Sequence, residues 1–329
     1  MFNVLNCYYF VCYLPLYTGK NKKVTDFSIF FVYLPKKFLM MRKLLLITSL
    51  FFVGVIAGNA QRKRAFMVGI SHYDTALTGY QWNNINGAED IRLLSPILKK
   101  QGCLLTTLLD EQATYQNIIN QLSTFTKQTK KGDIVYLHFS THGQPVEDMN
   151  GDEEDGWDEA IIPIDAYKLY KKGVYEGKKH ILDDQLNQYV KKLREKIGPN
   201  GFLYVVIDAC HAGTSSRAND ETVRGTKVGF TYNNKVFKPS TQKKSHYKIE
   251  ASTKMSHVMY LEACRPDQVN MEIEVKNKRY GPLSYNIAQA LRATPLSTNA
   301  NEFLNNVKAS IMNGGFWPNN QNMVTETSF

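Results

Sequence analysis

Two short runs that are apolar at nearly every position constrain the fold of this chain more than any other feature. They span residues 134–139 and 202–207, and polar residues and glycine follow each of them. A strand with one face in water alternates apolar and polar residues, so an unbroken apolar run indicates a strand that is covered on both faces. Strands of this kind belong to parallel sheets with helices packed on either side.

Other segments complete an alternation of strands and helices. Apolar runs at residues 65–70 and 103–109, each bounded by turn residues, are predicted to be strands. Segments of helical period are predicted to be helices at residues 88–98, 116–125 and 184–197. This order predicts an α/β domain with a largely parallel sheet.

After the first sixty residues the chain is predicted to have a large part, a linker and a small part. Residues 61–213 form the large part, and residues 258–329 form the small part, with a strand at 258–263 and a helix at 283–292. Between them, residues 214–257 are rich in Ser, Thr, Asn, Lys and Arg. A polar stretch of this length inside a compact domain is typical of a functional loop.

Residues 41–60 have the three parts of a secretory signal peptide. Basic residues after Met41 precede an apolar run at 44–57, and Gly58-Asn59-Ala60 follows it. We expect cleavage after Ala60 and export, either to the periplasm or out of the cell. The alternative is a membrane anchor, but the run is shorter than the roughly 20 apolar residues that a spanning helix needs. No stable membrane span is therefore expected after cleavage.

Residues 1–40 fit no such scheme. They are rich in Tyr, Phe and Lys, and their apolar stretch at 27–34 stops at Pro35. We expect synthesis to start at Met40 or Met41, which makes residues 1–40 an upstream extension. A second membrane segment is the alternative, and a short run bounded by proline supports it poorly.

The formal net charge of +10 does not indicate a nucleic-acid partner. Residues 1–60 carry seven Lys and Arg and one Asp, so most of the excess positive charge lies there. The rest of the chain is close to balance, and no basic stripe interleaved with aromatic residues occurs in it. Nucleic-acid binding is therefore not expected.

Polar motifs follow the two apolar runs. The first run leads into Ser140-Thr141-His142-Gly143, and the second into Asp208-Ala209-Cys210-His211-Ala212-Gly213. Carboxyl ends of neighbouring parallel strands form the crevice where ligands bind, so His142 and Cys210 are expected to meet there. An imidazole can hold a nearby thiol as the reactive thiolate, and the amides of Gly143 and Cys210 could stabilise an oxyanion. Taken singly, such a cysteine is more often a small buried hydrophobe, and such a histidine is usually structural.

These motifs resemble those of caspases and metacaspases. Residues 136–143 are similar to the strand that ends in Ser-Gly-His-Gly in both groups, and residues 208–213 to the Asp-x-Cys-His-Ser-Gly of metacaspases. The resemblance to the metacaspase branch spans most of residues 64–292. It implies a caspase-like (caspase-hemoglobinase) α/β fold, with a mostly parallel central sheet flanked by helices on both faces. It also implies a cysteine endopeptidase with Cys210 as nucleophile and His142 as general base.

The residue two positions before the cysteine indicates the specificity. Caspases have Gln there and bind acidic residues, whereas this chain has Asp208. A carboxylate beside the scissile bond favours Arg or Lys at the P1 position of a protein or peptide substrate. The resemblance adds Asp90 and Ser140 to this P1 pocket. The alternative is that Asp208 and Asp90 only cap helices.

Residues 148–159 concentrate acidic side chains. They fit an EF-hand poorly, because Glu153 replaces the glycine of its sharp turn. The resemblance implies a different Ca²⁺ site, formed by Asp158, Asp183 and Asp184. One further acid of the family's site is a basic residue in this chain, and a solvated acidic loop without metal is the alternative. No organic cofactor is expected.

The polar stretch after Gly213 offers basic residues to a protease of this specificity. We expect self-cleavage there, with Arg217, Arg224 and Lys227 as candidate sites. Arg217 also stands where the family has its further calcium-binding acid. An uncut surface loop is the alternative.

Two other functions remain open. A catalytically inactive family member would serve as a scaffold or binding protein. A clostripain- or gingipain-type peptidase directed to Arg or Lys would use a similar sheet, but the Asp183-Asp184 pair and the Asp-x-Cys-His motif favour a metacaspase. The three cysteines after Ala60 are an odd number, so at least one thiol stays outside disulfides within the chain.

Overall fold

A computed structural model describes residues 61–73, 82–210, 223–226, 228–238 and 249–329 of the chain. Of the first sixty residues it describes only the paired strands β1 (Val11–Cys12) and β2 (Phe30–Phe31). The chain separates into two compact units, Met1–Ala60 and Gln61–Phe329. The predicted signal peptide at 41–60 lies outside the described residues. Within the described residues, no helix is long and apolar enough to cross a membrane.

The second unit is built on a sheet of six strands in the order β13-β10-β9-β5-β3-β4. Its strands are β3 (Lys63–Gly69), β4 (Leu104–Leu109), β5 (Ile134–Ser140), β9 (Phe202–Asp208), β10 (His257–Glu262) and β13 (Val324–Thr327). Neighbours from β10 to β4 run parallel, and β13 pairs antiparallel with β10 at the edge. Every residue of β5 and β9 is buried, as their unbroken apolar runs predict.

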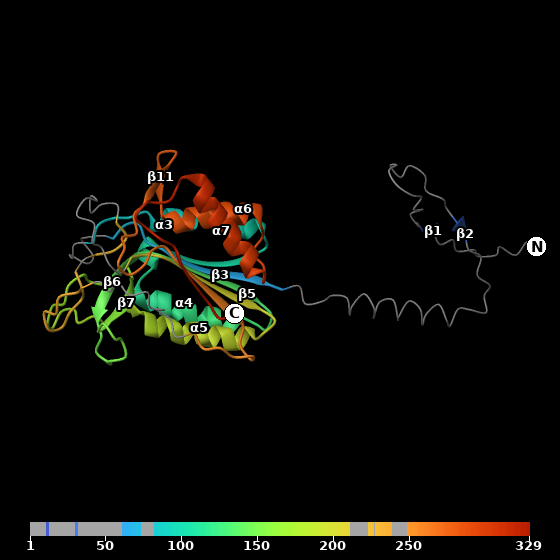
Figure 1. Cartoon of the computed structure of the whole chain (residues 1–329). Helices are drawn as coiled ribbons and strands as arrows, with labels where there is room; N and C mark the ends of the chain where they lie inside the picture. Colours follow the sequence, from blue (N-terminus) through green and yellow to red (C-terminus); the bar gives the residue numbers. More distant parts are fainter. Residues whose placement is uncertain are drawn as a thin grey trace, which may run out of the picture. The chain divides into compact units, whose positions relative to one another are not determined.

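Helices cover both faces of this sheet (Figure 1). One face packs against α3 (Gly87–Lys100), α6 (Pro282–Ala293) and α7 (Ala300–Gly314). The other face packs against α4 (Tyr115–Gln128) and α5 (Asp183–Ile197). Successive residues of the buried strands enter the two cores in turn, because side chains alternate across a strand. The predicted architecture, a mostly parallel sheet between two helical layers, is confirmed.

Several further elements were not predicted. They are α7, β13, the short 3-10 turn η2 (Asp110–Gln112), the three-stranded sheet of β6 (His142–Glu147), β7 (Trp157–Ile162) and β8 (Ile181–Leu182), and the hairpin of β11 (Ile273–Val275) and β12 (Lys278–Tyr280). Most of these segments mix polar and apolar residues without a clear period, so their packing partners decide their conformation.

The register of the two central strands positions the candidate site. β5 and β9 are parallel neighbours, and Ser140 lies opposite Asp208 at their carboxyl ends. His142 and Cys210 each follow two residues further along the chain. β10, from the predicted small part, continues the same sheet beside β9. Both predicted parts therefore contribute strands whose carboxyl ends lie at the same end of the sheet.

Candidate active site

Two backbone amides converge on one carbonyl oxygen beyond the ends of β5 and β9. The N–H groups of Gly143 and Cys210 donate to the carbonyl of Arg224, at N···O distances of 3.2 Å and 2.9 Å. These are the two amides that the sequence predicts as an oxyanion hole. Paired donors of this kind stabilise the charge that develops on the oxygen of a tetrahedral intermediate.

The imidazole of His142 is held between two aromatic rings. Its centroid lies 4.8 Å from the ring centroids of both Tyr73 and Trp82, and it stacks on Trp82. Its Nε2 lies 2.8 Å from the carbonyl oxygen of Asn83. A carbonyl only accepts, so the neutral ring carries its proton on Nε2 and its lone pair on Nδ1.

The Nδ1 atom of His142 is available as a base. It is buried and has no hydrogen-bond partner among the described residues. Burial lowers the pKa of His142 to about 3, and the hydrogen bond to Asn83 opposes this shift. The ring is therefore neutral near physiological pH, as a general base must be.

The thiol of Cys210 is buried at the same edge of the sheet. Its Sγ donates to the carbonyl of Gln268 at 3.0 Å, and it forms no disulfide. Cys264 donates to the same carbonyl at 3.8 Å. Its hydrogen bond with Cys210, together with burial, raises the pKa of Cys264 well above its usual value. Cys264 is therefore a neutral neighbour of the predicted nucleophile.

The three predicted P1-pocket residues surround one guanidinium group, that of Arg224. Its Nη1 donates to Asp90 Oδ2 at 2.6 Å and to Ser140 Oγ at 2.5 Å. The same nitrogen lies 3.7 Å from Asp208 Oδ1. The side chain of Arg224 is 0% exposed. Burial lowers its pKa and the surrounding carboxylates raise it, with a net upward shift, so the guanidinium stays charged.

Asp208 and Asp90 also hold the start of α6. Asp208 Oδ2 accepts from the backbone N–H and the hydroxyl of Ser284, at 2.7 Å and 2.6 Å. Asp90 Oδ1 accepts from the N–H of Gly281 at 3.0 Å. Burial raises the pKa of Asp90 to about 7, and the charge of Arg224 opposes this shift. Each of these two carboxyl groups therefore caps the start of α6 and also contacts the guanidinium of Arg224.

Two further residues that contact Arg224 or Asp208 carry no signal in the sequence. Glu272 Oε1 accepts from Nε and Nη2 of Arg224, at 3.1 Å and 2.9 Å. Asn270 donates from Nδ2 to Asp208 Oδ1 at 2.7 Å. Both precede β11 in a stretch without a motif, so only the chain path brings them to the pocket.

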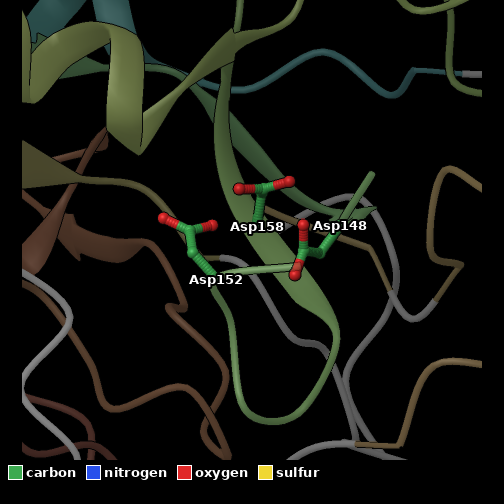
Figure 2. Close-up of side chains that lie close together, drawn as sticks. All are labelled: Asp148, Asp152 and Asp158. Atoms are coloured by element: carbon green, nitrogen blue, oxygen red, sulfur yellow. The ribbon is translucent and has the colours of Figure 1, made fainter. Parts of the chain in front are cut away.

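Three carboxylates gather in the loop between β6 and β7 and at the start of β7 (Figure 2). One oxygen each of Asp148, Asp152 and Asp158 lies within 4.8 Å of the others. Asp158 is a predicted calcium ligand, whereas Asp148 and Asp152 are not in the predicted set. Burial, followed by the charge of Asp148, raises the pKa of Asp158 to about 7.

The other two predicted ligands, Asp183 and Asp184, begin α5. Oδ1 of Asp183 is buried without a hydrogen-bond partner among the described residues. Burial, followed by the charges of Glu159 and Asp158, raises the pKa of Asp183 to about 8. Neither Asp183 nor Asp184 belongs to the group of three carboxylates. A buried carboxylate oxygen without a donor, in the field of Asp158, still fits the chemistry of Ca²⁺.

Comparison with known families identifies the fold family. The family model of the caspase domain, Peptidase C14, matches residues 62–326. The chain belongs to this family. The matched residues include those predicted for the oxyanion hole and the P1 pocket, and the three carboxylates of the acidic cluster.

Curated metacaspases match this chain, which confirms the predicted resemblance. Metacaspase-1A of Aspergillus niger is 22% identical over 280 residues, which cover 71% of this chain and 63% of that protein. Metacaspase-1B of Aspergillus fumigatus is 32% identical over 166 residues, which cover 47% of this chain and 36% of that protein. The chain thus spans less than two thirds of the length of these relatives.

A solved structure shares the fold of the caspase domain. The crystal structure of protein GSU0716 from Geobacter sulfurreducens matches with a TM-score of 0.57 over 81% of this chain and 93% of that chain. The two sequences are 20% identical. Together with the family match, this likeness confirms the predicted caspase-like fold.

The predicted linker of the caspase domain is partly buried. Of the candidate self-cleavage residues, Arg217 and Lys227 lie outside the described residues, and the buried side chain of Arg224 lies among the residues predicted for the P1 pocket. Phe230 is also buried, and its N–H donates to the Pro145 carbonyl at 2.8 Å. Residues 233–236 of the same linker are exposed. The buried and exposed positions leave both self-cleavage and an uncut loop as predictions.

Proposed function

We propose that this protein is a cysteine endopeptidase that cuts peptide bonds after Arg or Lys. The observation that carries the proposal is the way in which the rest of the chain holds Arg224. Its carbonyl oxygen accepts from the amides of Gly143 and Cys210, and its guanidinium lies among Asp90, Ser140 and Asp208. This is the arrangement that a substrate with a basic P1 residue would need.

The main chain around Arg224 also lies as a substrate would. Its N–H donates to the Asn270 carbonyl at 3.0 Å, and Val223 forms an antiparallel bridge with Met271. Peptides often bind to proteins as an added strand with its side chains in pockets. The Arg224–Gly225 bond is therefore the bond that the site would cut first.

The geometry supports a sequence of proton transfers. The thiol of Cys210 would turn from the Gln268 carbonyl and give its proton to Nδ1 of His142. The thiolate would attack the P1 carbonyl carbon, and the two amides would stabilise the oxyanion. His142 would then protonate the leaving amine, which leaves a thioester. Water, losing a proton to the same nitrogen, would hydrolyse the thioester and restore the thiol.

We infer that the unprocessed chain inhibits itself. While Arg224 fills the P1 pocket, no other basic side chain can enter it. Gly225 suits the position after the scissile bond, because a Cβ atom there would lie 2.1 Å from the Cys210 carbonyl oxygen. Self-cleavage after Arg224 would release the segment and open the pocket.

Calcium binding is part of the proposal. Asp158 and its neighbours Asp148 and Asp152 would hold the ion, with Asp183 and Asp184 beside them. Bound Ca²⁺ would neutralise these carboxylates, so it should raise the thermal midpoint of unfolding relative to chelator. Asp158→Asn should remove this shift, and Glu176→Gln, at an exposed acid, should keep it. Equal thermal midpoints of unfolding with and without Ca²⁺ would contradict the proposed calcium site.

Export is proposed from the segment at 41–60. The mature chain would then begin at Gln61. Mass spectrometry of the exported protein would show this start, and a chain that keeps its first sixty residues would contradict it.

Hydrolysis of peptides that differ only at P1 tests the activity. The full chain should cleave after Arg or Lys and not after Asp, with Ca²⁺ or chelator as the compared conditions. Cys210→Ala should abolish cleavage, including cleavage of the chain itself. If none of the peptides is cut under either condition, an inactive scaffold becomes the better explanation.

A further inference from the structure

Glu272 contacts the part of the Arg224 side chain that lysine lacks. Its Oε1 accepts from Nε at 3.1 Å and from Nη2 at 2.9 Å. Asp90 and Ser140 instead accept from Nη1. Lysine ends in a single ammonium group and has no counterpart of the Nε donor.

Groups other than Arg224 hold Glu272 in place. Its two carboxylate oxygens accept from the backbone N–H and the side-chain amide of Asn86, both at 2.6 Å. Asn86 precedes α3 as its N-cap residue. The side chain of Glu272 is 0% exposed. A carboxylate fixed in this way is ready to receive a guanidinium without rearrangement.

A lysine at P1 would satisfy only one end of the pocket. Its ammonium could take the place of Nη1, where Asp90, Ser140 and Asp208 meet. Glu272 would then remain buried without its cationic partner, and an uncompensated buried charge is strongly unfavourable. The planar fork of arginine reaches both ends at once.

We propose that Glu272 makes this pocket select arginine over lysine at P1. The inference rests on the proposed peptidase function and narrows its basic specificity. A purely structural role for Glu272, as an anchor of Asn86 at the start of α3, would affect both kinds of substrate equally.

The test compares Glu272→Gln with a matched control in the full chain. The substitution keeps the shape of the side chain and removes its charge. Glu274→Gln is the control, because Glu274 lies two positions further on with a side chain that is 61% exposed. The measured quantity is kcat/KM for two peptides that are identical except for Arg or Lys at P1.

We expect the unsubstituted chain to favour the Arg peptide. Glu272→Gln should lower kcat/KM for this peptide by on the order of 10- to 100-fold, the size of a lost hydrogen bond to a charged group. The value for the Lys peptide should change by less than about threefold, and Glu274→Gln should keep the original ratio.

A second readout needs no added substrate. Chains with Arg224 should cut themselves at this position faster than chains with Arg224→Lys, and Glu272→Gln should remove the difference. If kcat/KM falls equally for both peptides in Glu272→Gln, or if the ratio of the two values is unchanged, the proposed role of Glu272 is wrong. The proposed peptidase function would still stand. If the unsubstituted chain cuts neither peptide nor itself, the proposed function fails and the inference fails with it.

Discussion

The carbonyl oxygen of Arg224 lies 2.9 Å from the backbone nitrogen of Cys210. Arg224 therefore places its own carbonyl beside the backbone of the predicted nucleophile, while its guanidinium lies among the residues predicted for the P1 pocket. A single residue thus contacts both the predicted oxyanion hole and the predicted P1 pocket. Activity toward other proteins should depend on whether this residue leaves.

Arg224→Gln should prevent self-cleavage after position 224. Glutamine is neutral and cannot pair with Asp90 and Asp208, so it should leave the pocket. Peptide hydrolysis should then begin without a lag, and gel electrophoresis with mass analysis would show an uncut bond. Lys238→Gln, at an exposed linker residue, is the control and should still be processed. Normal processing after position 224 in Arg224→Gln would contradict the assignment.

Gly281→Ala should block the P1 pocket. A Cβ atom at this position would lie 2.1 Å from Asp208 Oδ2 and 2.5 Å from Nη1 of Arg224. We expect kcat/KM for basic peptides to fall by about 100-fold or more, since misplacement of about 1 Å can cost that much. Gly314→Ala is the matched control, because a Cβ atom there would make only ordinary contacts of 3.7 Å and longer. Equal activity of the two variants would refute the steric argument.

Trp82→Ala should loosen the imidazole of His142. The indole stacks on the imidazole and donates from Nε1 to the Ala166 carbonyl at 3.1 Å. Without it, kcat should fall by about 10- to 100-fold with little change in KM, because Nδ1 would lose its orientation. Trp82→Phe keeps an aromatic ring and should retain most of the activity. A change confined to KM would show that Trp82 acts on substrate binding instead.

His180→Gln should change the pH dependence of stability. Burial lowers the pKa of His180 to about 4, against the hydrogen bond to the Gly177 carbonyl, from an ordinary value of 6.5. Between pH 6.5 and 4 the unfolded chain binds a proton here that the folded chain does not, so this histidine destabilises the fold as the pH falls. Glutamine does not titrate.

The variant should therefore gain stability relative to the unsubstituted chain as the pH falls from 6.5 to 4. The gain should reach about 1.4 kcal/mol per pH unit at most. Urea unfolding at several pH values measures it, and the difference between the two proteins cancels the contributions of other groups. A difference that does not vary with pH would show that His180 titrates normally in the fold.

The sequence predicts the central sheet and its two helical layers well, because local patterns of residue types determine these strands and helices. Unbroken apolar runs at 134–139 and 202–207 require burial on both faces, and such burial requires a sheet between helices. The positions of His142 and Cys210 after these runs place them at one edge of the sheet. α7 and the small sheets were missed, because segments of mixed polarity take their conformation from neighbours distant in sequence.

The sequence by itself determined the sheet, the edge at which the site lies and the residue types of the predicted dyad. Only the tertiary structure decided that the Arg224 guanidinium meets Asp90 and Ser140, that Glu272 contacts the same group and that the Asn83 carbonyl accepts from His142. Arg224 and Asp90 are 134 positions apart, and Arg224 and Glu272 are 48 apart. No local pattern encodes such a meeting, because it depends on the path of the whole chain between the partners. A backbone carbonyl such as that of Asn83 leaves no mark in the sequence at all, since every residue has one.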